Sequence, residues 1–256
     1  MANAGTARLQ RSFLPTLFRG PAFQQCLTPR RGVSNGSPRK GVCHDVGVIV
    51  SNLLTAEHGF PTRDEVQERK LVTVHQVHGS RVVEAAEAPA EADAVWTARE
   101  GVALGVKTAD CVPLLLEDPV QKRVAAVHSG WRGTWAEIAP LAVTALGGNP
   151  KDLRAAIGPC IRVCCYVVSE ELAAQFAGRY GAPVVERREG RPYLNLAKTV
   201  RLQLQRAGLS QIDDVGDLCT SCDARFHSYR REKGAPGRQV SFIACAFPRG
   251  GAATSL

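Results

Sequence analysis

Runs of hydrophobic residues predict several strands before the first helix. Apolar stretches of strand length cover residues 71–77, 102–106, 113–116 and 123–127, and a further one covers 240–246. Stretches this short, rich in β-branched residues and bounded by glycine or polar residues, are typical of strands. Parallel βαβ units would show strict alternation of strands and helices, which this chain does not. The order of elements predicts a single α+β domain built on a mixed sheet.

Three helices are predicted, over residues 134–148, 169–180 and 195–208. The first begins with Thr134-x-x-Glu137, a capping-box pattern in which each side chain accepts a backbone N–H near the helix start. Serine and asparagine begin the other two helices, and glycine ends the first and the third. These helices are expected to form a layer beside the sheet.

The formal charge of +8 on the 256 residues is concentrated at the N-terminus. Residues 1–44 contain seven Lys or Arg and no Asp or Glu, whereas the chain from Asp45 onward has 25 basic and 24 acidic residues. A nearly neutral body does not favour a nucleic-acid partner. We predict a poorly ordered basic tail at 1–44, before a folded domain at 45–256. A transit peptide, a disordered tail and an over-long start are all compatible with this composition.

No apolar run approaches the roughly 18 residues of a membrane span, so we expect a soluble, cytoplasmic protein with no membrane partner. The nine cysteines are an odd number at irregular spacing. This pattern favours reduced intracellular thiols over a disulfide framework. Cys164 and Cys165 are interpreted as core residues. Cys219-x-x-Cys222 is a single pair, for which ordinary packing is favoured over a zinc or redox role.

Three segments place a metal-competent side chain where an apolar strand ends, namely His78, Cys111 and His128. Two imidazoles and one thiolate suit Zn²⁺, and three protein ligands leave a fourth position for water or substrate. From spacing alone, three separate structural roles are the commoner explanation. His75 is expected on the opposite face of the same strand as His78, so it is not a candidate ligand.

Two further segments have the composition of a binding site. The turn 129–133 leads into the helix expected at Thr134, where free N–H groups and Arg132 would attract an anion. A plain turn with a solvent-facing arginine is the alternative. Residues 226–231 combine aromatic, hydroxyl and guanidinium groups that could stack a base and hold a phosphate. A surface loop would explain the same residues.

Taken together, these motifs resemble the laccase-domain family, once described as multicopper polyphenol oxidoreductases and later as zinc purine nucleoside phosphorylases. They run in family order from about residue 53 to residue 247. Because six motifs match, no single one carries the identification. The matching motifs are His58-Gly-Phe-Pro-Thr-Arg63, Gln76-Val-His-Gly79, Lys107-Thr-Ala-Asp-Cys111, Val127-His-Ser-Gly-Trp-Arg-Gly133, Ala156-Ile-Gly-Pro-Cys160 and Phe226-His-Ser-Tyr-Arg-Arg231.

The resemblance implies a β-sandwich core flanked by helices, and zinc held by His78, Cys111 and His128, with copper as the alternative metal. It implies that residues 45–256 form a purine nucleoside phosphorylase domain. The implied substrates are phosphate with adenosine, inosine or S-methyl-5'-thioadenosine. Adenosine deaminase activity is the implied second reaction.

For such a reaction, phosphate must be held near the ribose C1′ and the departing purine must be assisted. Arg63, Arg132 and Arg230 are candidates for binding phosphate, and Asp110 is a candidate general acid or base. The segment between Arg63 and His78 is shorter than is usual for the family, which leaves substrate preference open. The oligomeric state is also open, with a monomer as one outcome.

Two other functions are compatible with the family resemblance. A copper-dependent polyphenol oxidase would need many histidines for its copper centres, and the chain has six. A non-catalytic binding module on the same fold would have no need of the three candidate ligands. Both are therefore weaker explanations than a zinc enzyme.

Overall fold

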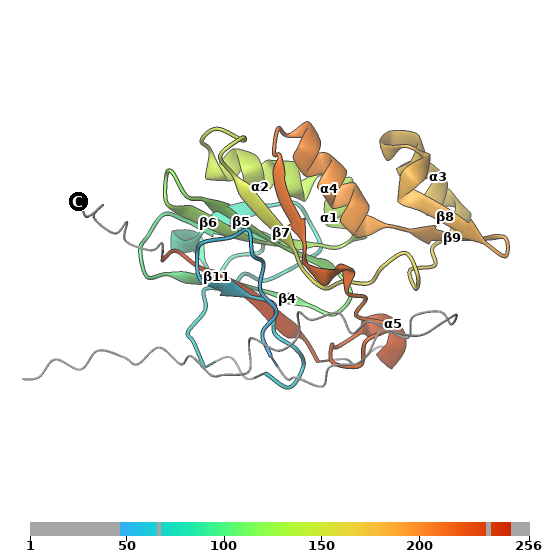
Figure 1. Ribbon diagram of the computed structural model, residues 1–256, viewed down its shortest axis with the longest axis horizontal. Coiled ribbons are helices and arrows are strands. Elements are labelled where there is room, and N and C mark those ends of the chain that lie inside the picture. The colour runs from blue at the N-terminus through green and yellow to red at the C-terminus, as the bar shows by residue number, and fades with distance from the viewer. Residues whose placement is uncertain (1–46, 66–67, 234–236, 247–256) are drawn as a thin grey trace, which may run out of the picture. The chain divides into compact units, whose positions relative to one another are not determined.

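The computed structural model describes residues 47–65, 68–233 and 237–246 (Figure 1). The predicted basic tail, residues 1–44, lies outside these ranges. Mixed sheets and a few helices form the described part, so the predicted α+β class is confirmed. No helix in the described ranges is long and apolar enough to cross a membrane.

A six-stranded mixed sheet is the centre of the domain. Its two outermost pairs are parallel and its inner pairs are antiparallel. In spatial order the strands are β10 (Gln211–Asp214), β7 (Arg154–Ile157), β5 (Val112–Asp118), β6 (Arg123–Ser129), β3 (Ala94–Thr97) and β2 (Val82–Glu84).

A second, antiparallel sheet packs on one face of the first. It contains β1 (His58–Gly59), β11 (Gln239–Ala244) and β4 (Ala103–Thr108). Because alternate residues of a strand face opposite sides, Leu115 of β5 packs in the cluster between the sheets, while Leu114 packs in the cluster on the other face. This two-sheet core with helices on one side agrees with the sandwich implied by the family.

Helices cover the other face of the six-stranded sheet, with α2 and α4 above β5, β6 and β7 (Figure 1). The predicted helices at 169–180 and 195–208 are confirmed, and the side chains of Ser169 and Asn195 cap them. The helices are α1 (Trp131–Trp135), α2 (Ile138–Leu146), α3 (Glu170–Tyr180), α4 (Leu196–Arg206) and α5 (Tyr229–Glu232), with 3-10 turns η2 (Ala85–Glu87), η3 (Ala182–Val184) and η4 (Val215–Asp217) and the hairpin β8 (Val185–Arg188) and β9 (Arg191–Leu194).

The predicted helix at 134–148 is instead two helices, so the capping-box prediction is wrong. Thr134 lies inside α1, where its hydroxyl donates to the carbonyl of Gly130, four residues earlier. Glu137, in the left-handed region at φ 60°, is the cap of α2. The physical reason is Pro140, whose ring would clash with the carbonyl four residues back in a continuous helix. The helix end at Gly147 is confirmed.

The predicted strand at 71–77 is also wrong. This segment makes only isolated bridges, from Val72 to β4 and from His75 to Glu91, just before β3. The chain therefore passes from the three-stranded sheet to the six-stranded sheet within a few residues. Such a crossing cannot form a ladder with either sheet, although its backbone is extended as its β-branched residues predict.

Candidate metal centre and its cavity

His78, Cys111 and His128 lie together, with their ligand atoms all within 4.8 Å of one another. His78 follows the crossing segment and has a φ of 60°. Cys111 lies in the turn where the chain leaves β4 in one sheet and enters β5 in the other. His128 is the penultimate residue of β6. Cys111 and His128 therefore lie at strand ends, as the sequence predicted, whereas His78 does not follow a strand.

Asp93, which the sequence analysis missed, lies directly behind these donors and is fully buried. Its Oδ1 accepts from His128 Nδ1 at 2.7 Å and from the backbone N–H of His78 at 2.9 Å. Its Oδ2 accepts from the backbone N–H of Gly79 at 2.6 Å and of Val77 at 3.3 Å. Because a carboxylate only accepts, His128 carries its proton on Nδ1 and its Nε2 is left for another partner.

The electrostatics of the group favour an ionised thiol. Burial opposes ionisation of Cys111, but hydrogen bonds from His128 and His78 and their positive charge lower its pKa from 9.0 to about 7. Burial likewise opposes the charged form of His128, but Asp93 and Cys111 raise its pKa from 6.5 to about 9. These shifts favour a Cys111 thiolate beside a protonated His128 imidazole. A bound cation would take the place of the proton on the imidazole and stabilise the thiolate.

Gly130 leaves room next to the three donors. A Cβ at this position would lie 3.1 Å from Cys111 Sγ and 3.2 Å from the His78 ring, closer than ordinary van der Waals contact. The backbone of Gly130 has an ordinary φ of −75°. Space for the donors, rather than backbone conformation, therefore requires glycine here. A borderline-soft donor set with free space beside it fits Zn²⁺.

The three donors open onto a cavity of about 690 Å³. Cationic and aromatic side chains line it together with the metal donors, a composition that suits a ligand with both an anionic group and an aromatic ring. The lining residues are Val74, His75, Gln76, His78, Lys107, Thr108, Ala109, Asp110, Cys111, His128, Trp131, Ile161, Tyr166, Leu196, Tyr229, Arg230 and Arg238.

Asp110 lines the cavity beside Cys111, and both of its carboxylate oxygens are engaged. Oδ1 accepts from the Thr220 hydroxyl at 2.6 Å, and Oδ2 accepts from the Ser228 hydroxyl at 3.1 Å and the Arg230 backbone N–H at 2.7 Å. Asp110 has a φ of 89°, a strained conformation for a residue with a side chain. Its contacts hold the turn that presents Cys111.

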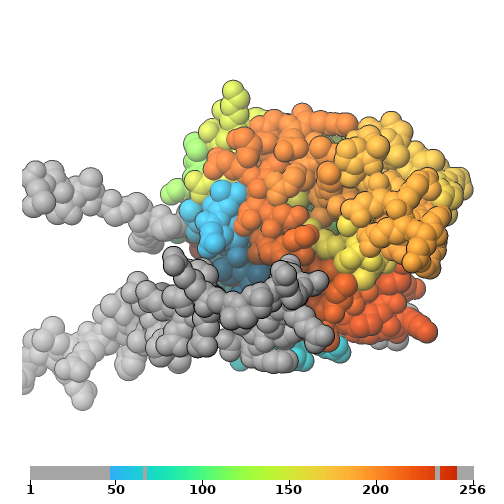
Figure 2. Space-filling view, turned by 45° about the vertical axis from the view of Figure 1, so that its right-hand side comes forward, coloured from blue at the N-terminus to red at the C-terminus, as the bar shows by residue number. Residues whose placement is uncertain are grey.

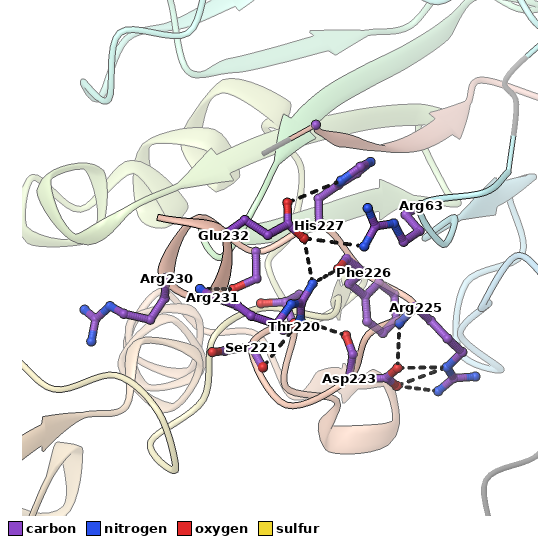
Figure 3. A network of polar contacts seen from close by, with 12 residues as sticks. Arg63, Thr220, Ser221, Asp223, Arg225, Phe226, His227, Arg230, Arg231 and Glu232 are labelled. Carbon is purple, nitrogen blue, oxygen red and sulfur yellow. Dashed lines mark hydrogen bonds and ion pairs between the residues drawn. The ribbon is translucent and has the colours of Figure 1, made fainter. Parts of the chain in front are cut away.

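Of the three candidate arginines, the structure places only Arg230 on the cavity wall. Its guanidinium donates to the carbonyls of Cys165 and Val167. Arg63 does not line the cavity, and its guanidinium pairs with Glu232 at 3.5 Å (Figure 3). Arg132 does not line the cavity either, and its guanidinium packs over the Trp131 ring.

The expected anion site at 129–134 is not built as predicted. The helix there, α1, begins at Trp131 and is five residues long. The hydroxyls of Ser129 and Thr134 bond to each other at 2.8 Å and are fully buried. The cationic side chains that line the cavity come from other segments, Lys107, Arg230 and Arg238. Lys107 and Arg230 lie within motifs noted in the sequence, whereas Arg238 lies in none of them.

The interpretation of Cys164 and Cys165 as core residues is wrong. Cys164 is exposed and Cys165 is half-buried. Both lie against Cys219 and Cys222, and the four sulfur atoms are within 4.8 Å of one another. The pair at 219–222 thus has a second pair beside it, separated by more than 50 residues in the sequence.

The sequence matches the family described as multi-copper polyphenol oxidoreductase laccase over residues 54–246. A Deinococcus radiodurans protein named purine nucleoside phosphorylase is 38% identical, over 89% of this chain and 92% of that protein. Mouse purine nucleoside phosphorylase LACC1 is 32% identical, over 68% of this chain and 43% of that protein.

Solved structures show the same fold. The crystal structure of YlmD from Geobacillus stearothermophilus has a TM-score of 0.67 and 28% identity, covering 75% of this chain and 92% of that one. The Bacillus licheniformis hypothetical protein YfiH has a TM-score of 0.69 and 26% identity, covering 78% of this chain and 97% of that one.

Proposed function

The chain belongs to the multi-copper polyphenol oxidoreductase laccase family, and from this premise we propose that it is a zinc-dependent purine nucleoside phosphorylase. The proposed substrates are phosphate with adenosine, inosine or S-methyl-5'-thioadenosine. Adenosine deamination to inosine is proposed as a second activity. The relatives named purine nucleoside phosphorylase support the first reaction.

One observation carries the proposal. Three metal donors, three cationic side chains and three aromatic side chains surround one cavity of about 690 Å³. Pockets that bind small organic ligands have volumes of about 300–1,000 Å³, so this cavity is large enough for a nucleoside together with phosphate. His78, Cys111 and His128 would hold zinc in this proposal.

The aromatic residues at the cavity suit a purine. Trp131 and Tyr229 are exposed, at 38% and 56%, although both line the cavity. Tyr166 lies under the Arg230 guanidinium, with 5.3 Å between the guanidinium carbon and the ring centre. We assign stacking on the base to these rings, because an aromatic face binds any purine without requiring a specific hydrogen bond.

The cationic residues would hold phosphate next to the ribose. Arg230, Lys107 and Arg238 line the cavity, and charge-assisted hydrogen bonds to phosphate are the strong ones. A phosphate oxygen then attacks C1′, the bond from C1′ to the purine nitrogen breaks, and its electron pair leaves with the purine, which takes up a proton. Arg132 is proposed to attract phosphate from outside the cavity, and Arg63 to support this face through Glu232.

Zinc, when bound, would act as a Lewis acid and lower the pKa of a water molecule to about 7. The resulting hydroxide is the nucleophile that deamination needs. Asp93 accepts the proton on His128 Nδ1 in a hydrogen bond, so His128 Nε2 is the atom that faces the other two metal donors, His78 and Cys111. Asp110 has three donors on its carboxylate, which favours a positioning role over the acid–base role expected from the sequence.

A copper oxidase is the weaker candidate. Among the described residues, two groups of side chains could hold a metal, and only one contains histidine. That group supplies two imidazoles, and several copper centres would need many more. Nothing in the cavity requires copper in preference to zinc.

Incubation of the purified protein with inosine or adenosine, with and without phosphate, tests the proposed function. We expect free base and ribose 1-phosphate only when phosphate is present, and loss of this reaction in Cys111→Ala. Release of base without phosphate would show a hydrolase instead. Oxidation of phenols with no reaction on nucleosides would support the copper alternative.

A further inference from the structure

A second cluster of metal-competent side chains lies apart from His78, Cys111 and His128. We propose that Cys164, Cys165, Cys219 and Cys222 form a tetrahedral Zn²⁺ site that joins two segments of the cavity wall. Neither the family description nor the names of the relatives refers to such a site. The inference does not depend on the reaction proposed above.

The spacing of the four sulfurs fits this ion. Two sulfurs bound to zinc at about 2.3 Å in a tetrahedron are about 3.8 Å apart. Cys222 Sγ lies 3.2 Å from Cys165 Sγ and 3.6 Å from Cys164 Sγ, and all four sulfurs lie within 4.8 Å of one another. Four thiolates in tetrahedral geometry are typical of zinc or iron–sulfur sites and not of copper(II), magnesium or calcium.

The local backbone explains how adjacent cysteines can point to one place. In a strand, the side chains of Cys164 and Cys165 would face opposite sides. Here they lie in a turn, in which the N–H groups of Cys165 and Tyr166 both donate to the carbonyl of Arg162. Both thiols can therefore reach the same side of the chain.

The second pair lies in a turn of its own. The N–H groups of Cys222 and Asp223 donate to the carbonyl of Cys219, which brings the ends of Cys219-x-x-Cys222 together. The Arg162 N–H, from the other segment, donates to Cys219 Sγ at 3.4 Å. Backbone N–H groups directed at a sulfur stabilise a thiolate and leave the sulfur free to bind a metal.

The two turns are held against each other before any metal is considered. Cys160 and Cys219 form a parallel bridge, and the N–H of Thr220 donates to the carbonyl of Cys160. Figure 2 shows the yellow stretch around residue 165 and the orange stretch around residue 220 adjoining on one face. A preformed site lowers the entropy cost of gathering the ligands.

Three arginines bind the backbone of the two turns, and their positive charge suits a site of four thiolates. With Zn²⁺, four thiolates would keep a charge of about −2. Arg188 donates to the carbonyl of Val163, and Arg230 to that of Cys165. Arg231 donates to the carbonyls of Thr220 and Ser221 in the other turn (Figure 3). Guanidinium groups are thus bound to both turns that carry the cysteines.

The place of the cluster indicates a structural role. Ile161 and Tyr166, on either side of the first turn, line the cavity. Thr220, in the second turn, donates to Asp110, next to Cys111. A zinc ion between the two turns would therefore fix this wall of the cavity. It would leave no open position for substrate, since all four ligands come from the protein.

Metal analysis of the purified full chain tests the proposal. Cys222→Ser should lower bound zinc by about one equivalent per chain relative to the wild type, and Cys164→Ser should do the same. Both residues are exposed, which limits the damage to folding. Cys245→Ser is the matched control, because that thiol contacts the Lys122 carbonyl at 3.2 Å and a hydroxyl can keep this bond. It should retain all the zinc.

Cobalt substitution shows whether the metal is bound by the four cysteines or by His78, Cys111 and His128. Co²⁺ bound by four thiolates gives intense ligand-to-metal charge-transfer absorption, and this should persist in Cys111→Ala and disappear in Cys222→Ser. Equal zinc content in Cys222→Ser and the wild type would overturn the proposal. Iron in place of zinc would overturn it too, as would a disulfide between the two turns, detected by mass spectrometry of peptides from the unreduced protein.

Discussion

Substitution of Asp93 by asparagine should weaken metal binding at His78, Cys111 and His128 without removing any of these donors. Each carboxylate oxygen of Asp93 accepts two N–H groups. The amide NH₂ of asparagine must replace one oxygen, so two donors lose their acceptor and face another donor. Hydrogen bonds to a charged group contribute about 1.5–3 kcal/mol each, so the local loss is about 3 kcal/mol or more.

Part of this loss should appear as metal affinity. Mutation of a residue behind a metal ligand typically lowers affinity by about 10- to 100-fold. Zinc competition with a chromophoric chelator measures this directly, and the melting temperature of the same sample reports the change in stability. The expected result for Asp93→Asn is at least about a 10-fold rise in the zinc dissociation constant.

Asp118→Asn is the matched control for this experiment. Asp118 is also a buried carboxylate, and its Oδ1 accepts two backbone N–H groups in the turn after β5. Its substitution should leave zinc affinity unchanged, because the remaining amide oxygen can accept both N–H groups. If a folded Asp93→Asn binds zinc as tightly as the wild type, the reasoning that Asp93 orients the ligands is wrong.

Three further predictions concern the cavity and its surroundings. Gly130→Ala should reduce zinc occupancy, measured by metal analysis, because its Cβ would press on Cys111 and His78; full occupancy would contradict the close contacts. Arg230→Ala should raise the phosphate KM by about 10- to 150-fold, which corresponds to a loss of about 1.5–3 kcal/mol, and by more than Arg132→Ala does; the reverse order would assign phosphate to Arg132. Burial and the charge of Arg63 lower the pKa of His227 below 6.5, so the unfolded chain binds more protons and stability should fall as the pH drops through 6.5. Calorimetry should show that the melting temperature of His227→Gln falls less than that of the wild type between about pH 7.5 and 5.5. An equal fall in the two proteins would show that His227 does not contribute.

Residue type and local pattern made His78, Cys111 and His128 candidate donors, but it was the family resemblance that assigned them to one metal site. Cys111 lies between two apolar runs, and His128 ends a third. Asp93 could not be found in this way, because its role depends on burial behind β6, and an aspartate between alanines has no distinctive local pattern. The cluster of four cysteines was missed for a similar reason, since its two pairs are more than 50 residues apart.

The errors in secondary structure have different physical causes. Extended backbone at 71–77 follows from its β-branched residues, but ladder formation depends on where the two sheets lie. The break between α1 and α2 was present in the sequence as Pro140, which is compatible only with the first turn of a helix. Local propensity therefore predicts conformation better than it predicts partners.

The fate of the ribose tests the central proposal most directly. Phosphorus NMR of the protein with inosine and inorganic phosphate would follow ribose 1-phosphate, while chromatography measures hypoxanthine in the same sample. The proposed function predicts that the two products appear in equal amounts and that inorganic phosphate falls by the same amount. Hypoxanthine with free ribose and unchanged phosphate would contradict it, and so would the release of no free base from inosine, adenosine or S-methyl-5'-thioadenosine.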